Sequence, residues 1–129
     1  CLKYQISNME YNLSTRNKLA TAFGGLYNGG TLEFLTAADA VLGTISLPNP
    51  AFGAASLGGI PKSGTWSDNN ADASGTAVKA VFISADGNDR ATVPVGVAGS
   101  GADMIINSVN IIQGGSIVVN SYTYTVPAS

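Results

Sequence analysis

The sequence contains no histidine, a single cysteine and few charged residues. Without histidine it lacks the commonest general base, the usual metal ligand and every Ser-His or Cys-His nucleophile pair. One cysteine excludes an internal disulfide, and the two shortages together exclude a structural zinc site. No GxxxxGK[ST] or GxGxxG phosphate-binding motif is present. We therefore expect no enzymatic activity, no catalytic residues, no cofactor and no metal.

Charged residues make up 11% of the chain, whereas about 25% is usual in soluble domains. The net charge is -2, and the six basic residues form no cluster. They are Lys3, Arg16, Lys18, Lys62, Lys79 and Arg90. A protein that binds nucleic acid normally carries a basic patch for the phosphates. We therefore predict no nucleic-acid partner.

The last 26 residues, 104–129, contain no charge at all. A membrane-spanning helix needs about 20 consecutive, mainly apolar residues. The longest apolar runs here, 104–106 and 117–119, have three residues each, and Asn, Gln and Gly separate them. β-Branched and aromatic residues between such breakers are typical of strands. The tail therefore predicts two or three strands and no membrane anchor.

The length of 129 residues predicts one domain. We divide it into an extended arm, residues 1–13, and a single β-domain, residues 14–129, which includes the helix. In the arm, Tyr4 and Ile6 of "YQIS" are candidate partner-interface residues, because a short strand of this kind can extend a neighbour's sheet. Cys1 is open to two interpretations, a lipidated cysteine after signal cleavage or the residue that follows a removed Met.

A helix is predicted between Ser14 and Tyr27, with Ser14 or Thr15 as the N-cap. Four apolar residues recur at helical spacing and form one face: Leu19, Ala22, Phe23 and Leu26. The Asn-Gly-Gly sequence at 28–30 ends the helix.

Seven or eight short strands follow, with turn residues every eight to twelve positions. The clearest are 31–36, 40–47, 76–84 and 90–97, and Pro94 makes the last of these an edge or bulged strand. No βαβ spacing appears. The pattern predicts a mainly β fold, an antiparallel β-sandwich (jelly-roll or immunoglobulin-like) or small barrel, with one short N-terminal α-helix.

The uncharged strand "SIVVNSYTYTV" raises a question about its edges. Strict alternation places Tyr122 and Tyr124 on one face with Val118, and Ile117 and Val119 on the other. No Lys or Glu guards this segment, as exposed edges usually require. It is therefore either a central strand of its own sheet or a strand covered by another subunit, and Tyr122 and Tyr124 are candidate partner-interface residues.

Two oxygen-rich loops and the single tryptophan are the remaining candidates for ligand contact. "SDNNADASG" (67–75) and "ADGNDR" (85–90) could hold Ca²⁺, but neither has the EF-hand spacing, and Asx-turns explain both. Trp66 is a candidate for stacking on a sugar, although a lone tryptophan in a small β-domain is more often a core residue.

Four segments resemble small virion structural proteins, of the decoration or cement kind, from tailed bacteriophages and prophages. They are "LSTRNKLATAFGGLYNGGTLEF", "GTISLPNPAFGAAS", "ASGTA" and "GSGADMIINSVNIIQGGSIVVNSYTYTVP". The resemblance runs in order from Thr15 to Pro127. The chain departs from the family pattern in "LEFLTAADA", which lacks a Gly after Thr36, and in "VKAVFIS", which replaces a more polar strand.

The resemblance implies a capsid decoration protein that bridges major capsid subunits, is assembled in the host cytoplasm and resides on the capsid surface. It also implies self-association, for which we expect a trimer. Three alternatives remain: a phage neck or tail protein, an extracellular filament or surface-layer subunit, and a carbohydrate-binding module that uses Trp66 and the tyrosines.

Overall fold

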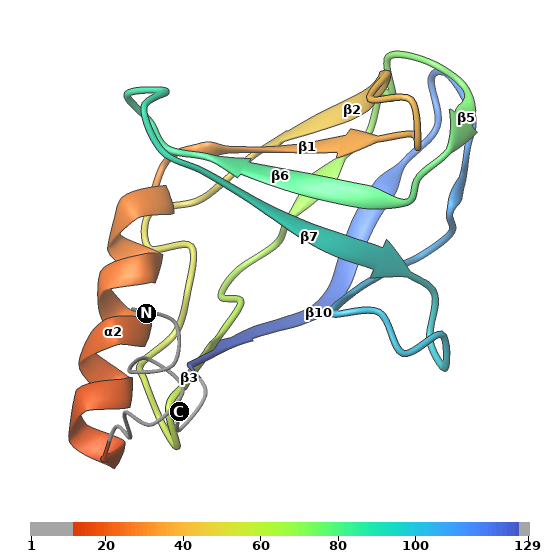
Figure 1. Cartoon of the computed structure of the whole chain (residues 1–129). Helices are drawn as coiled ribbons and strands as arrows, with labels where there is room; N and C mark the ends of the chain where they lie inside the picture. The colour runs from red at the N-terminus through yellow and green to blue at the C-terminus, as the bar shows by residue number, and fades with distance from the viewer. Residues whose placement is uncertain (1–11, 127–129) are drawn as a thin grey trace, which may run out of the picture.

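The computed structural model describes residues 12–126, which fold into one helix and a strongly curled sheet (Figure 1). The helix, α2, spans Leu13–Tyr27. The strands that follow are β1 Thr31–Leu35, β2 Val41–Ser46, β3 Gly59–Pro61, β4 Ser67–Asp68, β5 Gly75–Thr76, β6 Lys79–Ile83, β7 Arg90–Gly96, β8 Met104–Ile106, β9 Asn110–Ile111 and β10 Ile117–Thr125. The prediction of a mainly β fold with one short N-terminal helix is confirmed.

The main sheet has the order β2-β1-β6-β7-β8-β10-β3, and β4 pairs with β10 beside this path. All of its pairs are antiparallel except β7 with β8, so the expectation of a purely antiparallel sheet is wrong at one place. The parallel pair comprises only Val95↔Met104 and Gly96↔Ile105. Because the pairing is so short, a small glycine-containing loop suffices to connect the two strands.

The sheet curls until its two sides meet, which gives the domain the form of a small barrel. β4 pairs with β10 through Ile117↔Asp68 and Val118↔Ser67, and it also lies beside β2. There the Asp68 carboxylate accepts the Thr44 backbone N–H at 3.1 Å. Further along the chain, Asp72 and Ala73 donate their backbone N–H groups to the Leu42 carbonyl of β2. The outer margin of β2 is therefore covered by the chain itself.

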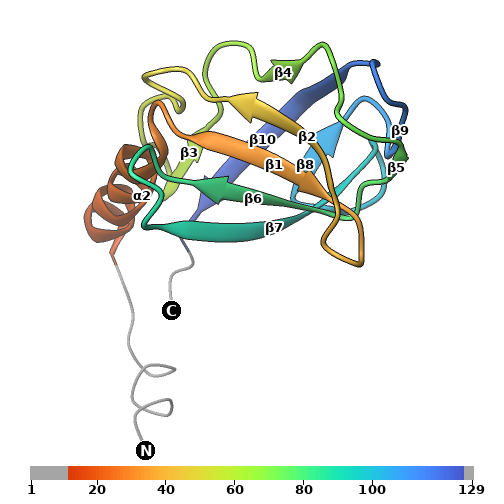
Figure 2. The same ribbon diagram turned by 90° about the horizontal axis from the view of Figure 1, so that it is seen from above.

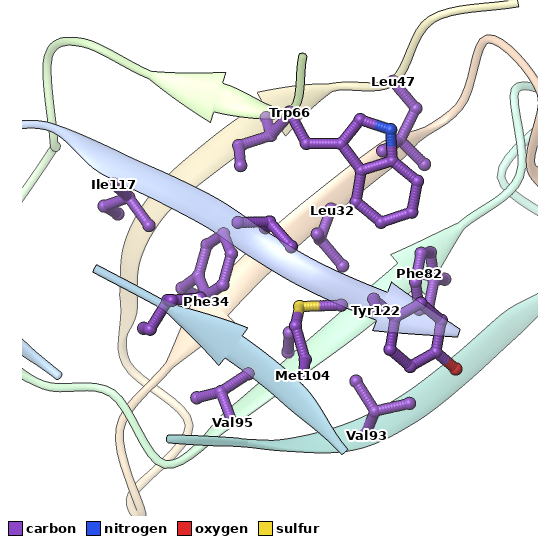
Figure 3. Close-up of a cluster of buried hydrophobic side chains, with 14 of the residues drawn as sticks. Leu32, Phe34, Leu47, Trp66, Phe82, Val93, Val95, Met104, Ile117 and Tyr122 are labelled. Atoms are coloured by element: carbon purple, nitrogen blue, oxygen red, sulfur yellow. The ribbon is translucent and has the colours of Figure 1, made fainter. Parts of the chain in front are cut away.

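The helix and a second small sheet cover opposite ends of this barrel (Figure 2). The second sheet pairs β5 with β9. Between the two ends, apolar side chains from both sides of the curled sheet meet in one core (Figure 3). Leu32 and Phe34 of β1 and Phe82 of β6 are fully buried there, as the alternation in their strands predicts.

The helix begins one residue earlier than predicted and is capped by a different side chain. Asn12, not Ser14 or Thr15, is the N-cap, and its Oδ1 accepts the Thr15 N–H at 2.9 Å. Gly24 and Gly25 lie inside the helix, which ends at Tyr27. The boundary proposed between an arm and a domain at residue 13 therefore falls within the first turn.

The helix face that packs on the barrel differs from the one that apolar spacing indicates. The buried residues are Ala20, Gly24 and Tyr27, with Phe23 half-buried at their side. Leu19 and Leu26 point outward and are 43% and 48% exposed. Small residues face the core because they let the helix backbone approach it closely. A Cβ at Gly24 would lie only 2.8 Å from Ile60 Cδ1.

A β-bulge changes the faces of the tail strand. The register of β10 against β8 shifts between Val119 and Ser121. A bulge inserts one extra residue, so the side chains beyond it change sides. Tyr122 therefore joins Ile117 and Val119 in the core, and the prediction that it lies on the opposite face from them is wrong.

The tail strand is a central strand of the sheet. On one side β10 pairs with β8, and on the other with β3 and β4. Of the two alternatives for this uncharged segment, the structure supports the first, so no partner subunit is needed to cover its edges. In the described part of the chain no helix is long and apolar enough to cross a membrane.

Candidate functional site

Trp66 lies at the centre of the core and not on the surface. Its side chain is 0% exposed, and its ring makes edge contacts with Phe52 and Phe82 at centroid distances of 5.3 and 5.9 Å. The indole N–H donates to the Ser63 carbonyl at 3.2 Å. A buried ring with a satisfied N–H cannot stack on a sugar. The prediction of Trp66 as a ligand contact is therefore wrong.

Tyr122 and Tyr124 are also turned inward. Tyr122 is buried, and burial, together with the negative charge of Asp103, raises the pKa of its phenol above the usual value of 10. Tyr124 is half-buried because its ring stacks on Phe23 of the helix. Neither ring is available as a broad contact surface for a partner. The other two predicted interface residues, Tyr4 and Ile6, lie outside the described residues.

The oxygen-rich loops are closed by hydrogen bonds of their own. Asp86 Oδ1 accepts from the Ser84 hydroxyl at 2.5 Å and from the Asn88 N–H at 3.0 Å, which lowers the pKa of Asp86. Asp68 Oδ1 accepts the Asn70 N–H in the same way. Both are the Asx-turns expected from the sequence. Residues 12–126 contain no group of three or more metal-ligating side chains.

Exposed apolar side chains form a row along α2. Leu19, Ala22 and Leu26 are all exposed and lie three and four residues apart, so they share one face of the helix. We call this face the helix row. The sequence pattern finds these residues correctly, but the structure places them toward solvent. Exposed apolar side chains that form a contiguous patch mark contact sites more often than isolated ones do.

A second feature is the tip of a tight hairpin, Ser56–Gly59. Ser56 and Gly59 exchange two backbone hydrogen bonds, of 2.9 and 3.0 Å, so the turn has only two central residues. These are Leu57 and Gly58, both with positive φ, at 53° and 79°. Leu57 is 76% exposed, more than any other large apolar side chain in the described chain. The sequence pattern does not single out Leu57.

A shallow groove lies beside this hairpin, between α2 and the segment that leads into the turn. Its volume is about 190 Å³. One wall is the helix face of Thr21, Gly25 and Asn28, and the other is formed by Gly53, Ala54 and Ala55, with Phe52 and Ile60 at the base. None of these side chains is charged. The groove is on a different face of the helix from the helix row.

No protein-family model, no curated protein and no solved structure matches this chain.

Proposed function

We propose that this chain is a non-enzymatic structural component of a tailed-bacteriophage particle, and that it decorates the head by binding the major capsid protein. Two observations support this proposal. The sequence resembles small virion proteins in order over residues 15–127, and the fold leaves apolar side chains exposed on a surface poor in charge.

The helix row is the observation that carries the proposal. In an amphipathic surface helix, the leucines normally face the core. In α2 the core side consists of Ala20, Gly24 and Tyr27, and the two leucines of the row face outward. A face of this kind suits a shell surface, where many copies each contribute a small apolar contact and symmetry repeats it.

The closed sheet determines how such contacts are made. The margin of β2 is covered by Asp68 and its neighbours, and β10 has partners on both sides. The outer margin of β7 carries Arg90 and Pro94, residues that oppose edge-to-edge pairing. Binding through side chains is therefore favoured over strand addition. This weakens the alternative of a filament built by inserted strands, and burial of Trp66 removes the basis for a carbohydrate-binding module.

The direct test is mass spectrometry of purified particles from a host that expresses this chain. A decoration protein is expected in a copy number comparable to that of the major capsid protein. A neck or tail protein, which the same surface would also suit, would be present in few copies per particle. If the chain is expressed but absent from the particles, the proposal is wrong.

A binding test addresses the helix row itself. Heads that lack the chain are mixed with the purified protein and sedimented, and the bound fraction is measured. We expect Leu19→Gln with Leu26→Gln to reduce binding about tenfold or more, since two exposed aliphatic contacts are lost. Glutamine is nearly as good a helix former as leucine, so the helix is retained. Ile112→Asn, at the far end of the barrel, is the control and should bind normally.

A further inference from the structure

The helix row has a small residue at its centre and a leucine on each side. Ala22 lies three residues after Leu19 and four before Leu26, and the two leucines are 43% and 48% exposed. This side of α2 faces away from the barrel (Figure 2). A small residue between two larger ones lets a second helix approach closely, at an interaxial distance of about 8 Å.

Opposite charges lie toward the two ends of this row. Lys18 precedes Ala22 by four residues, so its side chain continues the row toward the N-terminal end of α2. At the other end, Leu26 borders a hollow of about 300 Å³ between the helix and the connection from β6 to β7 (Figure 1). Asp86 and Asp89 also line this hollow, which we call the acidic hollow.

The charges of Lys18 and of the acidic hollow are not neutralised within the described part of the chain. Between residues 12 and 126 the only ion pair joins Lys79 to Asp39. The carbonyl groups at the C-terminal end of α2 add a partial negative charge to the two carboxylates of the hollow. The surface is therefore positive toward one end of the row and negative at the other.

We propose that the helix row of one copy packs against the helix row of a second copy, with the two α2 helices antiparallel and a two-fold axis at Ala22. In this arrangement a residue four positions before Ala22 lies across from the residue four positions after it, each about 6 Å along the helix from the axis. Lys18 of each copy therefore lies across from Leu26 of the other. There its ammonium group meets Asp86 and Asp89 of the acidic hollow.

The apolar part of the surface is self-complementary in the same arrangement. Leu19 of one copy packs beside Leu26 of the other, and the two-fold axis repeats this contact. The seam is short, so it belongs with the weak and reversible interfaces. Two copies complete it, so the expected species is a dimer instead of the trimer that the resemblance implies.

The pairing concerns the free protein, before it meets a particle. A paired copy cannot bind the shell through the same side chains, so the dimer must separate before the head is decorated. A weak dimer meets this requirement, because dilution or a stronger partner separates it by mass action. This competition rests on the proposed function, whereas the pairing itself does not.

Sedimentation equilibrium of the full chain over a concentration series tests the pairing. Lys18→Glu places a carboxylate beside the acidic hollow in both halves of the interface, so the dissociation constant should rise about tenfold or more. Adding Asp89→Lys exchanges the two charges and should lower the dissociation constant again. The backbone groups of Asp89, and not its carboxylate, bond to Ser84, so the turn is retained. The control Lys79→Glu makes the same change of charge at the other end of β6 and should associate as the wild type does.

A cysteine cross-link tests the position of the axis. In a chain with Cys1→Ser, Ala22→Cys places the thiols of two paired copies beside the axis. A disulfide needs Cα atoms about 4.4–6.8 Å apart, so oxidation should give a covalent dimer. Thr21→Cys is the matched control: the residue is also exposed on α2 but lies about 100° away around the helix, so it should not cross-link at a comparable rate.

Four results would overturn the proposal: a wild-type chain that stays monomeric at all accessible concentrations, equal effects of Lys18→Glu and Lys79→Glu, no recovery on adding Asp89→Lys, or equally fast cross-linking of Ala22→Cys and Thr21→Cys. The pairing and the proposed function can fail separately. A chain that is monomeric in solution but present on particles overturns only the pairing. A dimer that is absent from particles overturns only the virion role.

Discussion

The ring of Phe23 stacks on the ring of Tyr124, with centroids 3.8 Å apart and planes inclined by 7°. Phe23 lies on the helix and Tyr124 near the end of β10, so this contact joins the two ends of the described chain. Phe23 also makes an edge contact with Phe52 at 5.9 Å and a tilted contact with Tyr27 at 5.0 Å. Phe23 therefore attaches the helix to the barrel, together with the buried Tyr27, whose ring contacts Phe82 at a centroid distance of 5.5 Å.

Replacing Phe23 by alanine should destabilise the protein by about 2–3 kcal/mol, somewhat less than for a fully buried phenylalanine because the side chain is half-buried. Urea denaturation gives the free energy of unfolding. The matched control is Leu26→Ala on the same helix, which should cost about 0.5 kcal/mol or less because its side chain faces solvent. Equal losses for the two variants would contradict the observed orientation of the helix.

Asp68 closes the barrel by accepting the Thr44 N–H. Asp68→Ala leaves this partly buried amide without its partner and should cost roughly 1–3 kcal/mol. Amide hydrogen exchange at Thr44 should accelerate in the same variant. Asp68→Asn keeps one acceptor oxygen, which can serve either the Thr44 N–H or the Asn70 N–H but not both, so it should restore only part of the loss. Asp72→Ala is the control, because Asp72 contacts β2 through its backbone N–H and not through its carboxylate.

The single tryptophan is a direct probe of the core. Since Trp66 is fully buried, its fluorescence should be blue-shifted in the folded chain and move to the red on unfolding. Saturating glycans should leave the folded spectrum unchanged. Trp66→Ala should destabilise the fold by about 3–5 kcal/mol, the usual cost of removing a large buried aromatic side chain. A glycan-dependent shift in the wild type would contradict the buried position.

Alkaline pH should destabilise the protein in part through Tyr122. Burial raises the pKa of Tyr122 above the value of 10 that applies in the unfolded chain, so above pH 10 the unfolded state releases a proton that the folded state retains. This contribution to stability is complete below pH 10 and is lost as the pH rises further. Tyr122→Phe should therefore flatten the fall in the urea midpoint between neutral and strongly alkaline pH. An unchanged pH profile would exclude Tyr122 as a source of this dependence.

Substitution by alanine should change the stability of the protein differently at the two adjacent glycines of the helix. Gly25→Ala should stabilise the protein by about 1 kcal/mol, because alanine is the better helix former and the site is open. At Gly24 the added methyl group meets Ile60 Cδ1 in the core, so the same gain is offset and the variant should be less stable than Gly25→Ala. Thermal unfolding of the two variants side by side measures this difference. A larger gain at Gly24 would contradict the close helix-to-barrel contact.

The features predicted correctly from the sequence depend on local chemistry. The sequence predicts a helix between residues 14 and 27, and α2 spans Leu13–Tyr27, because Asn28 and the two glycines after it favour a helix end. Alternation assigned Leu32 and Phe34 to the core. The Asx-turns at Asp68 and Asp86 were expected from side chains that bond to the backbone two residues ahead.

The features that were missed depend on contacts between distant residues. Apolar spacing selected Leu19 and Leu26 as members of one helix face, but the core receives the side with Gly24 because Ile60 and Phe52 leave no room for a larger residue. The covering of β2 by Asp68 joins positions 24 residues apart. The sequence does not single out Leu57, because the glycines around it indicate a turn but do not reveal which residue of the turn has positive φ.

The extra residue in β10 makes the strand unequally sensitive to two kinds of change. Exchanging Asn120 for another polar residue alters only a side chain in solvent. Deleting it would remove the bulge, and strict alternation from Val119 would still place Tyr122 and Tyr124 on the core side. A strand that kept Asn120 but paired without the bulge would instead turn both tyrosines outward and bring the hydroxyls of Ser121 and Thr123 inside, so the bulge matters more for this half of the strand than the identity of residue 120.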